Sequence, residues 1–458
     1  MSEHVRFSAE KQRLFFKTQK TKDIGFRILQ LKTLKKAILA YEDRLYEALW
    51  KDLHKSKFEA YATEIGLVLA EIGLHIRHLR KWAKPRRVCT NQMIHFWSSS
   101  RIYKEPYGCV LIISPWNYPF QLLINPLVGA ISAGNCITLK SSEYSPHTSD
   151  VMDRMIREYF PSEFIAIYGG GREANQALLS QTWDYIFFTG SSLVGKVVME
   201  AAAKNLTPVS LELGGKSPCI VDHDANLKIA ATRIVWGKFL NAGQTCIAPD
   251  YLFVHRSVKD ELLKLMKQKI TDFFGVDPKV SPDYGRIATK AKTERLGLFL
   301  KGAHLLVGGE IDIDTRYVAP TIIDAIQQDD PIMQEEIFGP ILPVMEFETL
   351  DTVTGYLNSH AKPLAFYYFS GSGKKQADLL NMTSSGGGCI NEVVMHIANH
   401  NLPFGGVGNS GIGNYHGKFS FDVFSHTRSI MKKAVFPDIP VRYAPYKDKL
   451  SLLKMLIK

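Results

Sequence analysis

The stretch DYIFFTGSSLVGK, residues 184–196, holds a short run of aromatic and β-branched residues, a Gly-Ser turn and the start of a helical pattern. The same rhythm precedes it in GCVLIIS (108–114) and NCITLK (135–140), and it returns after SLELGGKSPCIV (210–221). Short apolar strands that alternate with helices form parallel sheets with helices on both faces. The sequence therefore predicts an α/β fold with two doubly wound, mainly parallel sheets and a boundary between them near residue 210.

Two regions fall outside this rhythm. Residues up to about 82 carry a helical periodicity that ends at Pro85, and we expect two or three covering helices there. Residues 88–105 follow a Pro-Arg-Arg turn and alternate weakly between polar and apolar positions. This pattern indicates a small β-arm outside both sheets.

The composition is that of an ordinary globular protein. With 458 residues, 45% of them hydrophobic, the chain is long enough for two or three compact domains. Its net charge of +11 is scattered among 45 acidic residues, which argues against a nucleic-acid-binding surface. Six cysteines lie far apart without metal or disulfide spacing, so we expect no metal and free thiols in a reducing, cytoplasmic location. The polar N-terminus, and the lack of an apolar run of roughly 20 residues, fit that expectation.

Cys246 lies in FLNAGQTCIAP (239–249), where small and amide residues follow a helical run and a proline closes the segment. This pattern favours a sharp loop that exposes the thiol and aims its backbone N–H at a bound oxygen. Taken alone, however, a cysteine is more often a small buried hydrophobe. Cys109, Cys136 and Cys219 lie in strand-like runs and fit that second interpretation.

Glu212 and Asn117 each follow a strand-like run. Glu212 stands just before a Gly-Gly turn, where partial burial would raise the pKa of its carboxyl group toward that of a general base. Asn117, in ISPWNYPF (113–120), can donate its amide to an oxyanion at a strand end, where ligand sites of α/β sheets collect. The alternatives are a surface glutamate and an asparagine that bonds its own turn.

Two further segments suit a dinucleotide, although each is also common in ordinary loops. The turn at Gly190 and Ser191 precedes a helix, where backbone N–H groups and the helix dipole can hold a phosphate. Lys140 and Glu143 follow another strand and suit ribose hydroxyl groups. HIANH (396–400) has the histidine spacing of a zinc motif but lacks its glutamate, so we predict no metal site there.

Together these segments resemble the motifs of the aldehyde dehydrogenase superfamily, in the same order and over essentially the whole chain. The segments that carry the resemblance are ISPWNYPF (113–120), TLKSSEYSP (138–146), FFTGSSLVGK (187–196), SLELGGKSP (210–218), NAGQTCIAP (241–249), QEEIFGPILPV (334–344) and LPFGGVGNSGIG (402–413). The wording PWNYP and the ending NLPFGGVGNSGIGNYHGKFSFDVFSH (401–426) look like the class 3 branch, which includes fatty and aromatic aldehyde dehydrogenases.

The resemblance implies NAD(P)-dependent oxidation of aldehydes, with medium or long aliphatic or aromatic substrates, to carboxylic acids through a cysteine thiohemiacetal and thioester. By position, Cys246 matches the family's nucleophile, Glu212 its general base and Asn117 its oxyanion donor. The residues that match its cofactor contacts are Trp116, Lys140, Glu143, Gly190, Ser191, Gly195, Glu336 and Phe338. The Glu143 carboxylate favours NAD, with NADP tolerated, because it repels a 2′-phosphate.

The resemblance also divides the chain. We expect a cofactor-binding domain from residues 1–87 and 106–211, and a catalytic domain from residues 212–412. Residues 88–105 and 413–440 would supply an oligomerisation arm and C-terminal segment that join two chains as a homodimer.

The tail, residues 441–458, ends in KDKLSLLKMLIK (447–458), which combines apolar residues at helical spacing with four lysines. This segment is too short to span a bilayer. We expect at most weak, salt-sensitive contact with a membrane surface, and a terminal helix packed on protein is an equally open alternative.

Three other functions stay open at this point. An acylating dehydrogenase would pass the thioester to coenzyme A, which the presence of Glu212 disfavours. A non-catalytic protein with this fold is disfavoured because each catalytic residue of the family is present. A basic protein that binds nucleic acid or membrane is disfavoured by the scattered charge.

Overall fold

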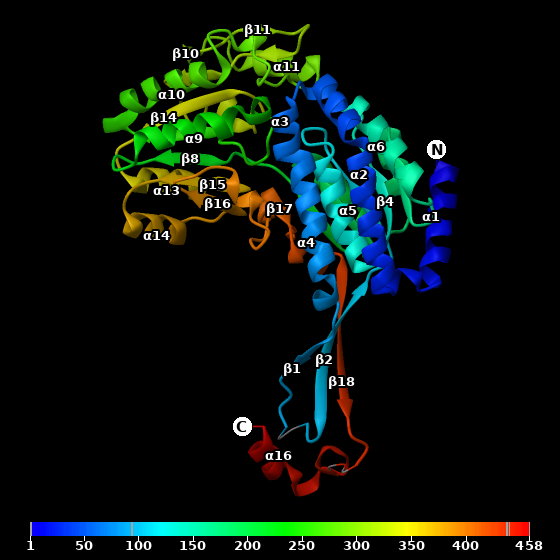
Figure 1. Ribbon diagram of the computed structural model, residues 1–458. Coiled ribbons are helices and arrows are strands. Elements are labelled where there is room, and N and C mark those ends of the chain that lie inside the picture. The colour runs from blue at the N-terminus through cyan, green and yellow to red at the C-terminus, as the bar shows by residue number, and fades with distance from the viewer. Residues whose placement is uncertain (1, 93–94, 437, 439, 458) are drawn as a thin grey trace.

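The computed structural model describes residues 2–92, 95–436, 438 and 440–457. Over these residues the protein has a six-stranded and a seven-stranded sheet, both mainly parallel, and two smaller antiparallel sheets (Figure 1). The three-stranded antiparallel sheet projects from the rest of the molecule. The predicted α/β fold, with two parallel sheets and a small β-arm, is confirmed.

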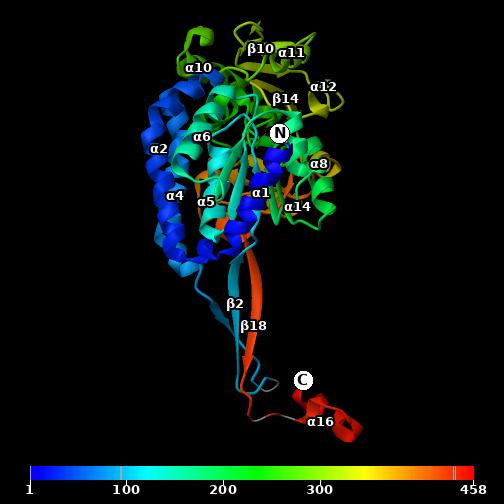
Figure 2. The ribbon, with the colours of Figure 1, turned by 90° about the vertical axis from the view of Figure 1, so that its right-hand side faces the viewer.

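The first sheet is built from the apolar runs that begin at residue 109. Its order is β17-β7-β6-β3-β4-β5, and its strands are parallel except at the edge, where β17 is antiparallel to β7. The strands are β3 (Cys109–Ile113), β4 (Cys136–Lys140), β5 (Ile165–Tyr168), β6 (Tyr185–Thr189), β7 (Val209–Glu212) and β17 (Gly411–Ile412). Every residue of β3, β4 and β6 is buried, because helices pack on both faces (Figure 2). Burial on both faces explains the unbroken apolar runs in the sequence.

Helices from two parts of the chain cover this sheet. They are α1 (Ser2–Lys17), α2 (Ile24–Leu53), α3 (Lys57–Ala60), α4 (Gly66–Trp82), α5 (Gln121–Ala133), α6 (Pro146–Tyr159), α7 (Arg172–Leu179) and α8 (Ser192–Ala203), with a π-helical turn, η2 (Tyr61–Ile65), between α3 and α4. The covering helices predicted before residue 82 are therefore present. α2 begins at Asp23, whose carboxylate accepts a hydrogen bond from the Phe26 backbone N–H at 2.7 Å, and it packs against α4, α5 and α6.

The second sheet has the order β10-β13-β14-β9-β8-β15-β16, and only the β10–β13 pair is antiparallel. Its strands are β8 (Pro218–Val221), β9 (Tyr251–His255), β10 (His304–Val307), β13 (Thr321–Asp324), β14 (Ile341–Phe347), β15 (Ala365–Phe369) and β16 (Gly387–Ile390). The helices of this half are α9 (Leu227–Phe239), α10 (Lys259–Phe274), α11 (Lys290–Leu298), α12 (Pro331–Gln334), α13 (Leu350–Ser359) and α14 (Gly373–Met382). A short hairpin of β11 (Ile311–Asp312) and β12 (Tyr317–Val318) lies beside α11.

The chain crosses between the two sheets twice. It leaves the first sheet after Glu212, at the end of β7, and enters the second sheet at Pro218. It returns at β17, where Gly411 pairs with Glu212. The carboxyl end of β7 therefore lies at the junction of the two halves, which is where side chains from both can meet.

The arm is formed by β1 (Arg86–Val88), β2 (Ser98–Pro106) and β18 (Ser425–Lys433), which follows helix α15 (Lys418–Val423). β18 pairs with β2 in one continuous antiparallel register, from Ser425 opposite Pro106 to Lys433 opposite Ser98. The tail helix α16 (Leu450–Leu456) lies near the far end of the arm in both views (Figures 1 and 2). Within the described ranges, none of the helices combines the length and the apolar character that a bilayer crossing requires.

Candidate active site

Glu212 is the last residue of β7, where the chain leaves the first sheet. It is 2% exposed, and neither of its carboxylate oxygens has a hydrogen-bond partner among the described residues. Burial without a partner disfavours the charged form, so the pKa of Glu212 lies well above its ordinary value. When ionised, a carboxyl group with a raised pKa is a stronger base than an ordinary glutamate, and it can also return the proton.

Cys246 follows a tight turn at the end of α9. Asn241, Ala242 and Gly243 have φ angles of 52°, 49° and 74°, so three consecutive residues lie in the left-handed region. Only glycine fits at position 243, because a Cβ there would lie 2.3 Å from the Gly339 carbonyl oxygen. The small residues before the cysteine thus form a sharp loop, which brings the thiol back over the carboxyl end of β7.

Gln244 fixes this loop from inside the protein. Its fully buried Nε2 donates to the carbonyl oxygens of Asn241 at 3.0 Å and Arg286 at 2.9 Å, and its Oε1 accepts from the Ala288 backbone N–H at 2.9 Å. The Gln244 carbonyl oxygen in turn accepts a hydrogen bond from Nδ2 of Asn117 at 2.9 Å. Since Asn117 follows β3 of the first sheet, this bond ties the loops of the two halves together.

Two cavities meet at the thiol and the carboxyl group. One has a volume of about 230 Å³ and the other of about 320 Å³. The residues that line both are Leu122, Thr189, Glu212, Leu213 and Cys246. The sulfur of Cys246 can therefore be approached from two sides.

The smaller cavity is mainly apolar. Its walls include Leu67 from α4, Trp236 from α9, and Ile397 and Phe404 from the loop after β16. None of these residues could be assigned to a site from the sequence, because each belongs to an ordinary helical or loop pattern and only the fold brings them together. The cavity suits the hydrocarbon part of a substrate.

Besides Glu212 and Cys246, the larger cavity is lined by six of the residues predicted from the sequence, namely Trp116, Asn117, Gly190, Ser191, Glu336 and Phe338. The rings of Trp116 and Phe338 meet edge to face with centroids 5.4 Å apart. Burial, and then the charge of Asp250, raise the pKa of Glu336 to about 8. Gly214 leaves room for this carboxylate, since a Cβ there would lie 2.3 Å from Glu336 Oε2.

Three of the predicted cofactor residues do not line either cavity. Gly195 lies buried inside α8, where a Cβ would lie 2.7 Å from Cδ2 of Leu213, so glycine permits the helix to pack closely on the strand end. Lys140, at the end of β4, pairs with Glu143 at 3.1 Å.

One residue that lines the larger cavity, Lys292, was not predicted from the sequence. Its Nζ lies 4.8 Å from the Trp116 ring centroid. A lysine in a helix carries no distinguishing signal in the sequence.

The thiol of Cys246 is held in its neutral form. Burial, and then the nearby Glu336 and Glu212, raise the pKa of Cys246 well above its ordinary range. The site therefore holds a protonated thiol next to a carboxyl group that can take up a proton, and thiolate formation requires transfer between them.

The two histidines of HIANH have different partners. His400 pairs through Nδ1 with Glu71 of α4 at 2.8 Å. His396 Nδ1 lies 3.5 Å from Sγ of Cys389 on β16. The i, i+4 spacing therefore does not bring the two rings to one ligand site.

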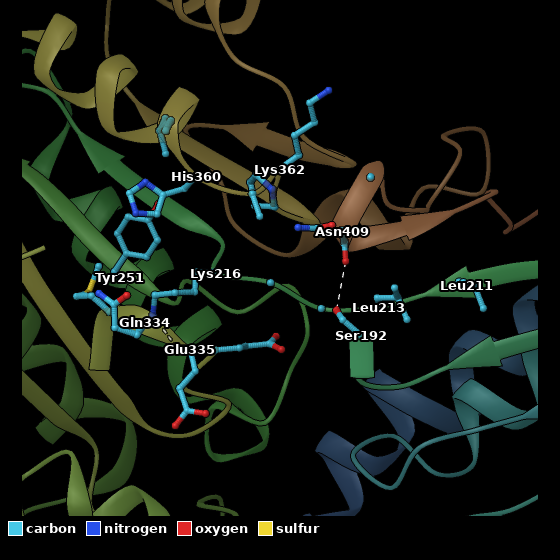
Figure 3. Close-up of a pocket in the computed structure, with 18 of the residues that line it drawn as sticks. Ser192, Leu211, Leu213, Lys216, Tyr251, Gln334, Glu335, His360, Lys362 and Asn409 are labelled. Carbon is cyan, nitrogen blue, oxygen red and sulfur yellow. Dashed lines mark hydrogen bonds between the residues drawn. The ribbon is translucent and has the colours of Figure 1, made fainter. Parts of the chain in front are cut away.

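A third cavity, of about 510 Å³, lies beside the segment that joins β7 to β8 (Figure 3). Its walls include Lys216, His360 and Lys362, and Ser192 Oγ donates to the Asn409 carbonyl oxygen at 3.2 Å across one side. Cys246, Glu212 and Asn117 are not among its lining residues. This cavity, although larger than the other two, is therefore not the one in which the candidate catalytic groups meet.

A protonated thiol and a buried carboxyl group, placed between an apolar cavity and a cavity that begins at a glycine turn, are typical of one class of enzyme. Thiol-dependent dehydrogenases hold an organic substrate and a nicotinamide dinucleotide on opposite sides of one sulfur. The aldehyde dehydrogenase family matches residues 3–430, and the chain belongs to that family.

Individual relatives extend over nearly the whole chain. A 4,4'-diaponeurosporen-aldehyde dehydrogenase of Staphylococcus aureus is 49% identical over 446 residues, which is 97% of each chain. Human aldehyde dehydrogenase family 3 member B1 is 45% identical over 92% of this chain and 89% of its own length. A substrate-bound structure of Staphylococcus aureus AldH superposes with a TM-score of 0.97 at 48% identity over 99% of both chains. The structure of an NAD-dependent aldehyde dehydrogenase from Sinorhizobium meliloti gives 0.86 at 28% identity, over 96% of this chain and 88% of its own.

The resemblance read from the sequence is therefore confirmed, including the family 3 branch. The protein is an NAD(P)-dependent aldehyde dehydrogenase, an oxidoreductase that converts aldehydes to carboxylic acids by the cysteine mechanism general to the family.

The turn before Cys246 gives a direct test of this geometry. Gly243→Ala should lower the melting temperature and slow alkylation of Cys246, because the new Cβ meets the Gly339 backbone and the φ angle of 74° is strained for alanine. The neighbouring Ala242→Gly is the matched control, and it should alter neither property much because glycine adopts a φ of 49° freely. Thermal unfolding and mass-spectrometric alkylation rates are the measurements. Wild-type behaviour of Gly243→Ala would show that the turn does not constrain the loop.

Proposed function

We propose that Cys246 is the nucleophile, Glu212 the general base and Asn117 the oxyanion donor of this dehydrogenase. The observation that carries the proposal is the meeting of the two cavities at Cys246 and Glu212. An aldehyde in the apolar cavity reaches the sulfur from one side while the other cavity stays open to a dinucleotide. Asn117 lines the second cavity, and a hydrogen bond to the nucleophile loop fixes its amide.

The acylation step begins with the neutral thiol and with Glu212 in its ionised form, since only a carboxylate can accept a proton. Glu212 takes the thiol proton, the sulfur bonds to the aldehyde carbon, and the aldehyde oxygen becomes an alkoxide. The side-chain amide of Asn117 and the backbone N–H of Cys246 donate to that oxygen and stabilise the thiohemiacetal. A nicotinamide dinucleotide in the larger cavity would supply the hydride acceptor needed to convert this adduct to a thioester.

The deacylation step uses Glu212 a second time. After Glu212 has released the thiol proton to solvent, its carboxylate takes a proton from water and the hydroxide adds to the thioester carbon. The carbon–sulfur bond then breaks to release the carboxylic acid, and Glu212 returns the proton to the departing sulfur, which restores the thiol. An acylating enzyme would instead transfer the acyl group to coenzyme A. A buried base within the same cavities as the thioester supports hydrolysis.

We propose NAD as the preferred cofactor, with NADP tolerated. The residues that would hold it are Trp116, Gly190, Ser191, Glu336 and Phe338. The cavity suits a cofactor because positions 190 and 214 are glycines, and a Cβ at either position would meet a neighbouring side chain. Lys140 and Glu143 would contact the ribose, where a carboxylate disfavours a 2′-phosphate. The NAD dependence of the Sinorhizobium meliloti relative supports this preference.

We propose medium or long aliphatic or aromatic aldehydes as substrates. The apolar lining of the smaller cavity supports this class, and the Staphylococcus aureus relative is named for 4,4'-diaponeurosporen-aldehyde.

We also propose a cytoplasmic location. The six cysteines are free thiols, which fit a reducing compartment.

Variants of the two central residues separate the two steps. Cys246→Ala should abolish aldehyde oxidation while NAD still binds, because no thioester can form. Glu212→Gln should give slow turnover, and any burst of reduced cofactor in it shows that acylation survives the loss of the base. Since burial raises the pKa of Glu212, the wild-type deacylation rate should rise with pH through that pKa, and Glu212→Gln should remove the rise. Stopped-flow absorbance at several pH values is the measurement, and turnover by Cys246→Ala above a few per cent of wild type would refute the assignment.

The apolar cavity predicts a dependence on chain length. Each added methylene should raise kcat/KM by up to about fourfold until the cavity is full, since burying one methylene contributes about 0.8 kcal/mol. Ala62→Trp places a bulky ring in the exposed wall of the cavity and should penalise long aldehydes more than short ones. Steady-state rates over an n-alkanal series measure both effects. A flat profile in the wild type would place the substrate elsewhere.

We propose that the protein is a homodimer joined through the arm. The free edge of β18 and the half-exposed Ile430 and Met431 support an interface there. Ile430→Asp with Met431→Asp should shift the mass seen by light scattering from dimer to monomer. Val276→Asp, at an apolar residue 94% exposed in the catalytic half, should leave the mass unchanged. A wild-type monomer or tetramer contradicts the proposal.

We also propose that the tail makes at most weak, salt-sensitive contact with an anionic membrane surface. Leu450, Leu453 and Met455 on α16 are exposed, and three described lysines lie near them in sequence. The helix has only seven residues, so its apolar surface is small.

A further inference from the structure

The chain between α2 and α4 carries three buried charged side chains that no motif in the sequence singles out. Lys55 is 1% exposed, Glu59 8% and Glu64 0%. They lie in and around α3 and the π-helical turn η2, at the junction of the two halves of the molecule (Figure 1). Charged groups are almost never buried this deeply unless they are paired, so each must have specific partners.

The ammonium group of Lys55 binds the segment that carries the oxyanion donor. Its Nζ donates to Glu64 Oε1 at 2.5 Å and to the Asn117 carbonyl oxygen at 3.0 Å. The same Nζ lies 3.9 Å from the Tyr118 ring centroid. Glu64 Oε2 accepts the Phe120 backbone N–H at 2.9 Å. The buried ion pair therefore holds the backbone on both sides of residue 118.

The same short segment also holds the nucleophile loop. Glu59 Oε1 accepts the backbone N–H of Asn241, the first left-handed residue of the turn before Cys246, at 2.9 Å. Asn241 Nδ2 donates to the Asn117 carbonyl oxygen at 2.8 Å, so this oxygen is shared with Lys55. Asn117 Nδ2 closes the ring of contacts on the Gln244 carbonyl oxygen.

We propose that Lys55, supported by Glu64, is a positioning residue for acylation: it fixes the Asn117 backbone so that the Asn117 amide faces the oxyanion. This inference rests on the proposed roles of Asn117 and Cys246. Lys55 itself touches neither substrate nor cofactor in this assignment. Its effect on the reaction passes through the orientation of one amide.

The alternative is that the ion pair only stabilises the fold. A fully buried ion pair is weak evidence for stability, because the desolvation of two charges offsets most of their attraction and an apolar pair often does as well. The Lys55 ammonium group also donates a hydrogen bond to the backbone carbonyl oxygen of Asn117, the residue whose side-chain amide is proposed to bind the oxyanion. Fixing that peptide accounts for a lysine at this position, and an error of about 1 Å in such a group can cost on the order of 10²-fold in rate.

The test is a single-turnover measurement of reduced-cofactor formation, with hexanal as the aldehyde, in Lys55→Met and in Asn117→Ala. Lys55→Met should slow acylation by about tenfold, less than Asn117→Ala, with the Kd for NAD unchanged. In the Asn117→Ala background, Lys55→Met should add less than about twofold, because the amide that it positions is gone. Lys259→Met is the matched control, since Lys259 is a largely buried lysine that pairs with Asp324 and Glu346 and lines neither of the two cavities that meet at Cys246.

Folding is separated from positioning by a second variant. Lys55→Met with Glu64→Gln removes both charges while the glutamine still accepts from the Phe120 backbone, so the fold is relieved of an unpaired carboxylate. This pair should melt closer to wild type than Lys55→Met and still acylate slowly. Restored acylation in the pair, or independent losses in Lys55→Met and Asn117→Ala, would overturn the proposal. If Asn117→Ala itself does not slow acylation, the proposed oxyanion role fails instead.

Discussion

The geometry of the proposed reaction centre depends on the hydrogen bond from Asn117 Nδ2 to the Gln244 carbonyl oxygen. Asn117 follows β3 of the first sheet and Gln244 precedes β9 of the second. This bond therefore fixes the position of a loop of one half relative to a loop of the other. Gln244 is fully buried, and its side chain is bonded to Asn241, Arg286 and Ala288. A peptide held on so many sides has little freedom to move, and preorganised donors of this kind are what acyl chemistry requires.

The same burial sets the charge state of the site. Cys246, Glu212 and Glu336 all have raised pKa values, and desolvation is the first cause in each case. A neutral thiol beside a neutral carboxyl group is compatible with an apolar cavity, whereas a resting thiolate there would be poorly solvated. The apolar character of the cavity and the raised pKa values of the groups beside it thus have one physical origin.

The sequence predicted what is encoded locally and missed what is encoded by the fold. Cys246, Glu212 and Asn117 are predicted as site residues because each lies in a short segment that resembles a family motif, and they remain proposals. The parallel strands could be predicted because burial on both faces makes them unbroken apolar runs. Lys55 and Glu64 look like ordinary charges in helical segments, and only the packing of α3 at the junction shows that they are buried. The cavity walls were unpredictable for the same reason, since Leu67, Trp236 and Ile397 meet only in three dimensions.

The N-terminal helices do more than cover a sheet. Glu71 of α4 accepts His400 Nδ1 at 2.8 Å and the Gly417 backbone N–H at 2.7 Å, so it anchors the loop that supplies Ile397 to the apolar cavity. Although burial acts in the opposite direction, the bonds from His400 and His75 keep the pKa of Glu71 well below its ordinary value. Glu59 holds the nucleophile turn in the same manner. Buried carboxylates from the N-terminal helices therefore hold two loops in place: the loop that carries Cys246, the proposed nucleophile, and the loop that supplies Ile397 to the cavity wall.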